Sequence, residues 1–121
     1  MSTRCRIGIK NTDNSVSSIY CHHDGYVEGV GKTLDKYWNN KDEIIELIAS
    51  GDISYLEEDL DETGFYNDGS SPKLSDTIME YLELDPVWIE YYYLYEDNKW
   101  FISEGSSFPF ISITDYLSRH V

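Results

Sequence analysis

Two stretches of the chain alternate apolar and polar residues with a period of two, and this pattern constrains the fold more than any other feature. Residues 3–10 place apolar side chains on one side and basic residues or glycine on the other, as in a half-buried β-strand. Residues 15–21 alternate again after a turn-forming segment rich in asparagine. The two stretches predict an N-terminal β-hairpin in which Cys5 and Cys21 lie near each other.

A further alternating stretch, residues 87–95, is longer and richer in aromatic side chains. It is followed by a polar turn at residues 96–99 and by the apolar residues 100–103. Strands joined by such a short polar turn form a hairpin. We therefore expect a second β-hairpin near the C-terminus, with its long strand at residues 87–95.

Helical patterns fill most of the remaining chain. Residues 32–39 carry an apolar stripe, and a second helix is expected to begin after Asn40 and to end at Gly51. Ser71 followed by proline predicts a third helix start, and Ser112 predicts a short final one. This order predicts an α+β fold: a mostly antiparallel sheet built from two β-hairpins, with about four short helices packed on one face.

Size and composition favour one domain spanning residues 1–121. A chain of 121 residues with 40% hydrophobic and 15% aromatic residues can bury one substantial core, whereas two cores would each be marginal. Two cysteines are too few for a disulfide framework, and neither a leader segment nor an apolar run of about 20 residues is present. We expect a soluble cytoplasmic protein with reduced thiols.

The charge is strongly acidic and unevenly distributed. The net charge is −14, yet residues 1–41 carry six basic and four acidic residues, whereas residues 42–104 carry eighteen acids and two lysines, a net of −16. Binding to nucleic acids or anionic membranes depends on cationic side chains. The sequence therefore argues against direct binding to DNA, RNA or a membrane.

The densest acidic segment places five carboxylates within residues 57–62, and self-repulsion on this scale destabilises a fold. One explanation is solubility, or neutralisation by the basic strand residues Arg4, Arg6 and Lys10. The other is a surface that binds a basic partner. The candidate partner-binding residues are Glu57, Glu58, Asp59, Asp61 and Glu62, with Asp68, Glu90, Glu96 and Asp97 as extensions.

A second candidate site lies where potential ligands and glycines are close in sequence. Its residues are Cys21, His22, His23, Asp24, Gly25, Gly29 and Gly31. Neighbours on a strand point to opposite faces, so at most two of the first four side chains converge, too few for a structural metal site. The glycines match neither a Walker A motif nor a dinucleotide fingerprint. We expect no metal and no cofactor here. The alternative function for the protein, if this segment does bind a ligand, is a small enzyme or a nucleotide- or metal-binding module.

A third possibility involves the aromatic cluster formed by tyrosines in residues 91–95, Trp88 and Trp100. One face of the expected strand belongs to the sheet core. The other face would leave amphipathic aromatic side chains at the surface, where they anchor interfaces. This reading predicts a self-associating protein.

Several segments carry a resemblance to a family of small phage and prophage proteins. They are Ser2-Thr3-Arg4, Ser18–Leu34, Leu47–Leu56 and the Lys99-Trp100-Phe101 hairpin. Family members open with Ser/Gly-Thr-Arg and carry a motif similar to Cys-His-x-Asp-Gly-Tyr-x-Glu-Gly-Val-Gly. The present chain departs from the family at His23, where tryptophan is usual, and at Val27, where proline is usual. The resemblance implies a viral or prophage origin and a bacterial host cytoplasm, and it implies no settled activity.

Together these observations predict a binding protein and not an enzyme. Small acidic phage proteins include inhibitors of host nucleases and defence complexes, an association at the level of class. The hypothesis is an inhibitor whose carboxylates occupy the positively charged nucleic-acid groove of a host protein, such as a CRISPR effector or a restriction enzyme.

Overall fold

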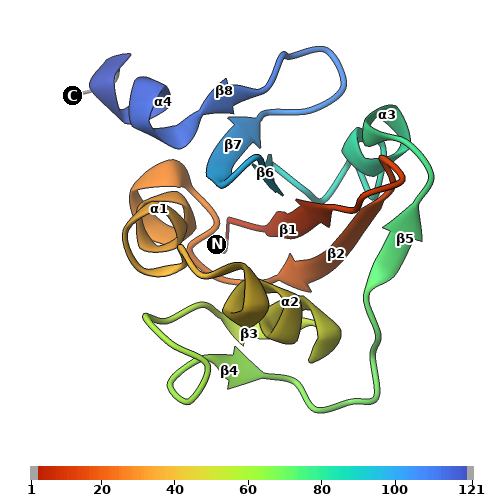
Figure 1. The fold of residues 1–121 in the computed structure, drawn as a ribbon, viewed down its shortest axis with the longest axis vertical. Helices are drawn as coiled ribbons and strands as arrows, with labels where there is room; N and C mark the ends of the chain where they lie inside the picture. The colour runs from red at the N-terminus through yellow and green to blue at the C-terminus, as the bar shows by residue number, and fades with distance from the viewer. Residues whose placement is uncertain (1–2, 120–121) are drawn as a thin grey trace.

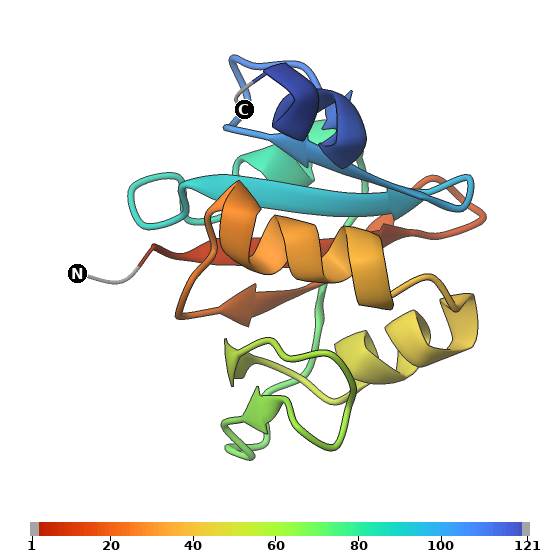
Figure 2. The same cartoon turned by 90° about the vertical axis from the view of Figure 1, so that its left-hand side faces the viewer.

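The chain forms a mixed β-sheet with helices on both of its faces (Figures 1 and 2). This computed structural model describes residues 3–119, so Ser2 and His120 lie outside the described part. The elements, in chain order, are β1 (Cys5–Lys10), β2 (Val16–Cys21), the π-helical turn η1 (Val27–Gly31), α1 (Lys32–Tyr37), α2 (Lys41–Ala49), β3 (Ile53–Tyr55), β4 (Gly64–Phe65), β5 (Lys73–Ser75), α3 (Ile78–Leu82), β6 (Tyr91–Glu96), β7 (Lys99–Ser103), β8 (Ile111–Ser112) and α4 (Ile113–Arg119).

Both expected hairpins are present, and their turns explain why. β1 and β2 pair antiparallel as predicted, and their register places Cys5 opposite Cys21, which agrees with the expected proximity of the two cysteines. β6 and β7 pair antiparallel through a two-residue turn in which Asp97 and Asn98 have φ values of 51° and 63°. Asp and Asn tolerate this left-handed backbone, which matches the twist of the flanking strands.

The sheet joins these hairpins differently from the expectation. β1 and β6 pair in parallel at its centre, and β2 and β3 pair in parallel beside them. The strand order is β4-β3-β2-β1-β6-β7-β8, with β5 added to β2. The expectation of a mostly antiparallel sheet is therefore only roughly right: the fold is α+β with a mixed sheet.

The sheet is covered on both faces, which corrects the expectation of helices on one face. On one side α1 and α2 cover residues such as Ile7, Ile19 and Tyr93. On the other side α3 and the segment before β6 cover Val16, Tyr92 and Leu94. The expected half-buried strand is consequently buried on both sides, and Arg6 is only 3% exposed.

The third helix begins later than the sequence pattern suggested. Residues 73–75 form β5 against β2, and α3 starts at Ile78. Its true cap is Thr77, whose hydroxyl accepts from the N–H of Glu80 while the Glu80 carboxylate accepts from the N–H of Thr77. This reciprocal capping box satisfies two otherwise free N–H groups. The prediction that Ser71 begins the helix is wrong.

Two other boundaries also moved. The stretch expected as a strand from residue 87 is irregular until Tyr91, because a turn at Asp85 (φ 48°) accepts hydrogen bonds from the N–H groups of Trp88 and Ile89. The glycine loop expected before residue 32 is instead helical from Val27 and runs directly into α1. Within residues 3–119 every helix is too short or too polar to cross a bilayer.

Candidate functional site

The acidic segment forms the connection between β3 and β4, at the side of the sheet that lies next to α1 and α2 (Figures 1 and 2). Residues 57, 58, 59, 61 and 62 are all exposed. Leu56 faces inward and packs in the core between them and the sheet. The loop therefore presents its five carboxylates to solvent from a base that is anchored in the core.

Hydrogen bonds hold this loop in one shape. The buried hydroxyl of Thr63 accepts from the N–H of Glu57 at 3.1 Å and donates to the carbonyl of Asp59 at 2.8 Å. The Asp59 carboxylate accepts from the N–H of Glu62 at 2.9 Å. The indole N–H of Trp38 donates to the carbonyl of Glu57 at 2.9 Å, which ties the loop to the end of α1. Asp59 thus has a structural role as well as a charge.

The four candidate extensions are in different situations. Glu96 forms an ion pair with Lys10 at 2.6 Å, and Asp97 next to it lies in the β6–β7 turn. Asp68 accepts hydrogen bonds from Ser70, which lower the pKa of its carboxyl group. Glu90 is exposed at the start of β6. The four residues thus lie in three segments of the chain outside the β3–β4 connection.

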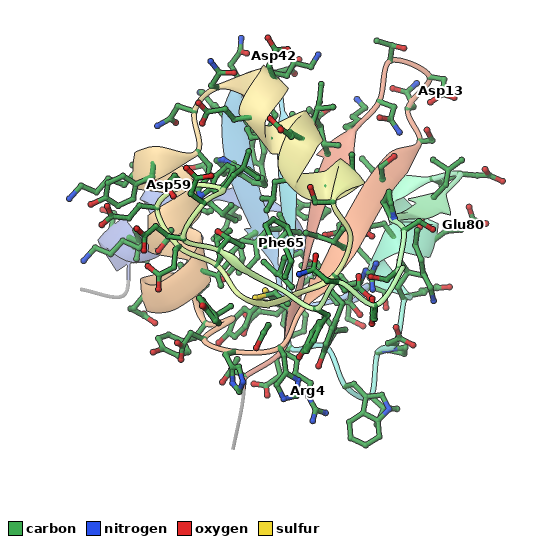
Figure 3. All side chains as sticks on the ribbon, turned by 90° about the horizontal axis from the view of Figure 1, so that it is seen from below. Arg4, Asp13, Asp42, Asp59, Phe65 and Glu80 are labelled. Carbon is green, nitrogen blue, oxygen red and sulfur yellow. The ribbon has the colours of Figure 1, made fainter. Side chains whose placement is uncertain are left out.

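Carboxylates outside the loop are spread around the molecule. In Figure 3, Asp59, Asp42, Asp13 and Glu80 point outward from different sides. A phosphate-like array on one face requires that they share that face. Asp42, Asp13 and Glu80 are therefore not part of the acidic surface of the β3–β4 loop, and their positions are consistent with a solvated surface.

A cavity of about 350 Å³ lies between the two hairpin turns. It is lined by residues of both charges, including Lys10, Lys41, Glu96 and Asp97. The residues of the second candidate site, Cys21 to Gly31, do not line it.

The side chains of the four residues from Cys21 to Asp24 do not gather around one point, although β2 ends at Cys21 and the rings of His22 and His23 meet edge to face with their centres 4.5 Å apart. Cys21 is fully buried and its thiol donates to the carbonyl of His23 at 3.4 Å. His22 turns the other way, and its Nδ1 lies 2.6 Å from the Tyr20 hydroxyl. Burial, and then the neighbouring His23 and Arg4, lower the pKa of His22, so its imidazole is neutral at pH 7. Within residues 3–119 no three His, Cys, Asp or Glu side chains are grouped to hold a metal ion.

The cysteine thiols are buried side by side. Burial raises the pKa of Cys5 well above its ordinary value, and the neighbouring thiol of Cys21 adds to this effect. A buried thiol with a raised pKa is a poor nucleophile because little thiolate forms. Cys21 itself is fully buried, so a substrate cannot reach its thiol, and the geometry does not favour it as a catalytic residue.

The glycines of this segment are explained by close packing. A Cβ at Gly25 would lie 2.8 Å from the carbonyl oxygen of Thr3 and 2.9 Å from the Cβ of Cys5. A Cβ at Gly29 would collide with the carbonyl oxygen of Asp24, and one at Gly31 would lie 3.2 Å from the ring of Tyr93. These positions need glycine to bring the helical turn onto the sheet, so a phosphate loop is not required to explain them.

The tyrosines of β6 belong mainly to the core. Tyr92, Tyr93 and Tyr95 are at most 4% exposed, and only Tyr91 is partly accessible. Tyr93 donates through its hydroxyl to the carbonyl of Gly25 at 2.7 Å. The tyrosine strand therefore offers little surface for self-association, whereas Trp88, just before the strand, is 61% exposed.

Trp88 reveals an arrangement that sequence reasoning did not identify. The guanidinium of Arg4 lies 5.1 Å from the centre of the Trp88 ring, in cation–π geometry. The two residues are 84 positions apart in the printed numbering, and the parallel pairing of β1 with β6 brings them together. The available signal was the placement of Arg4 and Arg6 on one strand face, without any clue to what lies opposite.

No protein-family model matches the chain, and comparisons with curated proteins and with solved structures give no match.

Proposed function

We propose that this chain is a binding protein whose β3–β4 loop engages a basic groove of a nucleic-acid-handling protein. On the resemblance to phage and prophage proteins, the partner is a host defence protein such as a CRISPR effector or a restriction enzyme. The loop carboxylates of Glu57, Glu58, Asp61 and Glu62 would occupy positions that phosphates take in the nucleic acid. The place of action would be the cytoplasm of a bacterial host.

One observation carries this proposal: the five carboxylates of the loop are exposed and, among the described residues, have no basic partner. The ion pair formed within residues 3–119 joins Lys10 to Glu96 and involves none of the loop acids. The loop is also fixed by Thr63, Asp59 and Trp38. Fixing like charges close together costs stability. A preorganised acidic loop reduces the entropy lost on binding and accelerates association with a basic surface.

The spread of the other acids limits the proposal to this loop. Glu96 is occupied by Lys10, and Asp42, Asp13 and Glu80 point to other sides (Figure 3). The contact would therefore be a single acidic element inserted in a groove, with long-range attraction from the remaining charge.

The test replaces four loop carboxylates by amides, as Glu57→Gln, Glu58→Gln, Asp61→Asn and Glu62→Gln in one chain. Asp59 is left unchanged because its carboxylate holds the N–H of Glu62. A matched control changes four exposed acids elsewhere, namely Glu28, Glu46, Asp76 and Glu83, so that both variants carry the same net charge.

The assay measures plasmid or phage survival in bacteria that carry one of a panel of CRISPR or restriction systems. We expect the unchanged protein and the control to protect against at least one system, and the loop variant to lose protection. With the purified target nuclease, inhibition should weaken as salt rises, because ionic screening reduces the attraction. Equal loss in both variants, or protection by neither unchanged protein nor control, contradicts the proposal.

A further inference from the structure

Arg6 in β1 and Arg4 just before this strand face the same side of the sheet. Neither arginine has a carboxylate partner in the described part of the chain. Arg6 is 3% exposed, and its guanidinium donates only to Ser18, through Nε to the hydroxyl at 3.0 Å and through Nη2 to the carbonyl at 3.1 Å. Arg4, two residues earlier, forms no ion pair with any acid among residues 3–119. In a chain of 23 acids against nine basic residues, two adjacent unpaired arginines are an unusual arrangement.

The Arg4 guanidinium has an unsatisfied hydrogen-bond donor. Its Nε is buried and, among the described residues, is the one buried side-chain nitrogen or oxygen without a hydrogen-bond partner. Leaving a buried charged donor unpaired is costly. Glu90 is the nearest acid in register, and its N–H donates to the Arg4 carbonyl at 3.0 Å, yet its carboxylate forms no ion pair with the guanidinium.

Aromatic side chains flank the same position. The exposed indole of Trp88 covers one side of the guanidinium, on a turn where Val87 is 85% exposed. Tyr20 lies on β2 and His22 directly after it, and the two are joined by the 2.6 Å contact between the hydroxyl and Nδ1, while the ring of His23 packs edge to face on that of His22. Burial raises the pKa of Tyr20 and lowers that of His22, and the positive charge of Arg4 acts on both groups as a smaller influence.

We propose that this cluster of Arg4, Tyr20, His22 and Trp88 binds a small phosphate-bearing molecule with a planar ring, of the nucleoside monophosphate class. The guanidinium of Arg4, backed by the charge of Arg6, would hold the phosphate, since its planar fork of N–H donors matches phosphate oxygens. The indole of Trp88 would stack on the base, an interaction that every nucleobase supports.

This site is separate from the acidic loop. In Figure 3, Arg4 projects from the lower edge of the molecule, whereas Asp59 and Asp42 project from its left side and from its top. The acidic net charge disfavours a polyanion, whereas a mononucleotide carries only one phosphate to be accommodated near Glu90. The inference therefore stands or falls independently of the proposed inhibitory role.

Isothermal titration calorimetry of the full chain tests the inference with four probes: AMP, inorganic phosphate, adenosine, and sodium chloride at matched ionic strength. We expect AMP to bind about tenfold more tightly than either phosphate or adenosine. Arg4→Gln should weaken AMP binding about tenfold or more. Trp88→Ala should weaken AMP binding but leave phosphate binding unchanged within about twofold.

A matched control exists on α1, where the ammonium of Lys36 lies 5.2 Å from the ring centre of Tyr37. Lys36→Gln and Tyr37→Ala remove an equivalent cation–π pair and should leave AMP binding unchanged. Circular dichroism verifies that each variant is folded, and Arg4→Lys provides a second variant that keeps the charge but loses the fork. Absence of AMP binding, AMP binding no tighter than adenosine, or full binding by a folded Arg4→Gln overturns the inference.

Discussion

Replacing Thr63 with valine tests whether the acidic loop is held by the hydrogen bonds of one buried hydroxyl. Valine has nearly the shape of threonine, and Thr63 is only 7% exposed, so the substitution removes polar contacts with little change in volume. The hydroxyl accepts from the N–H of Glu57 and donates to the carbonyl of Asp59. Both bonds close the segment that carries the carboxylates.

The expected cost follows from these two bonds. Each contributes about 1 kcal/mol net to folding, and the N–H of Glu57 is left without its partner, so Thr63→Val should lower the free energy of unfolding by about 2 kcal/mol. Thr63→Ser keeps the hydroxyl and loses one methyl group, which costs about 0.8 kcal/mol. For a chain of this length, the valine variant should melt roughly 6–12 °C lower than the unchanged protein.

Urea denaturation followed by circular dichroism measures the free energies, and amide hydrogen exchange locates the effect. The amides of Glu57 and Thr63 should exchange faster in Thr63→Val than in Thr63→Ser. If the valine variant is as stable as the serine variant, the hydroxyl does not hold the loop, and the preorganisation on which the proposed function relies is wrong.

Three further outcomes are expected. Gly25→Ala should lower the free energy of unfolding by about 1–3 kcal/mol in urea titrations, since the new methyl group meets the Thr3 carbonyl and Cys5. Tyr81→Phe should cost about 1 kcal/mol in the same assay, because the fully buried hydroxyl donates to the Tyr93 carbonyl at 2.6 Å. Burial raises the pKa of Tyr91 to about 12 from its ordinary value of 10.0, so the neutral phenol stabilises the fold fully below pH 10 and this contribution is lost as the pH rises through 12. Alkaline unfolding curves should therefore be flatter in Tyr91→Phe than in the unchanged protein over that range, and identical curves would contradict the assignment.

The elements that the sequence predicted correctly are those decided by neighbouring residues. The hairpin from Cys5 to Cys21 follows from alternation around one turn. The caps at Asn40 and Ser112 follow from side chains that accept hydrogen bonds from N–H groups two or three residues later. Such local signals need no knowledge of the rest of the fold.

The parallel pairing of β1 with β6 depends on residues far apart in the chain, and no local pattern reports it. Burial of both faces of β1 follows from that pairing, so Arg6 was misread as a solvent-facing residue. The predicted start of the third helix was wrong for a different reason. Ser71-Pro72 and Thr77 with Glu80 are both valid start signals, and the pairing of Ser75 and its neighbours with β2 selects the second.

The same distinction between local signals and long-range pairing applies to the candidate sites. The exposure of the β3–β4 carboxylates could be predicted, because carboxylates without basic partners stay in solvent while the neighbouring Leu56 and Leu60 pack on the core. The Arg4–Trp88 contact could not, because it requires the β1–β6 register and the turn at Asp85. The contact arises from the parallel pairing of β1 with β6 and not from a sequence motif.

The position of unpaired charge makes the two proposals separable in one molecule. Lys10 neutralises Glu96, whereas Arg4 and Arg6 remain unpaired on one side and the loop acids remain unpaired on another. The loop would need a positively charged partner, and the arginine cluster a negatively charged one. Neutralising the loop acids removes long-range repulsion of an anion, so it should leave or strengthen nucleotide binding while it abolishes protection against the host system. Changing Arg4 should do the reverse, because no residue is shared between the two sites.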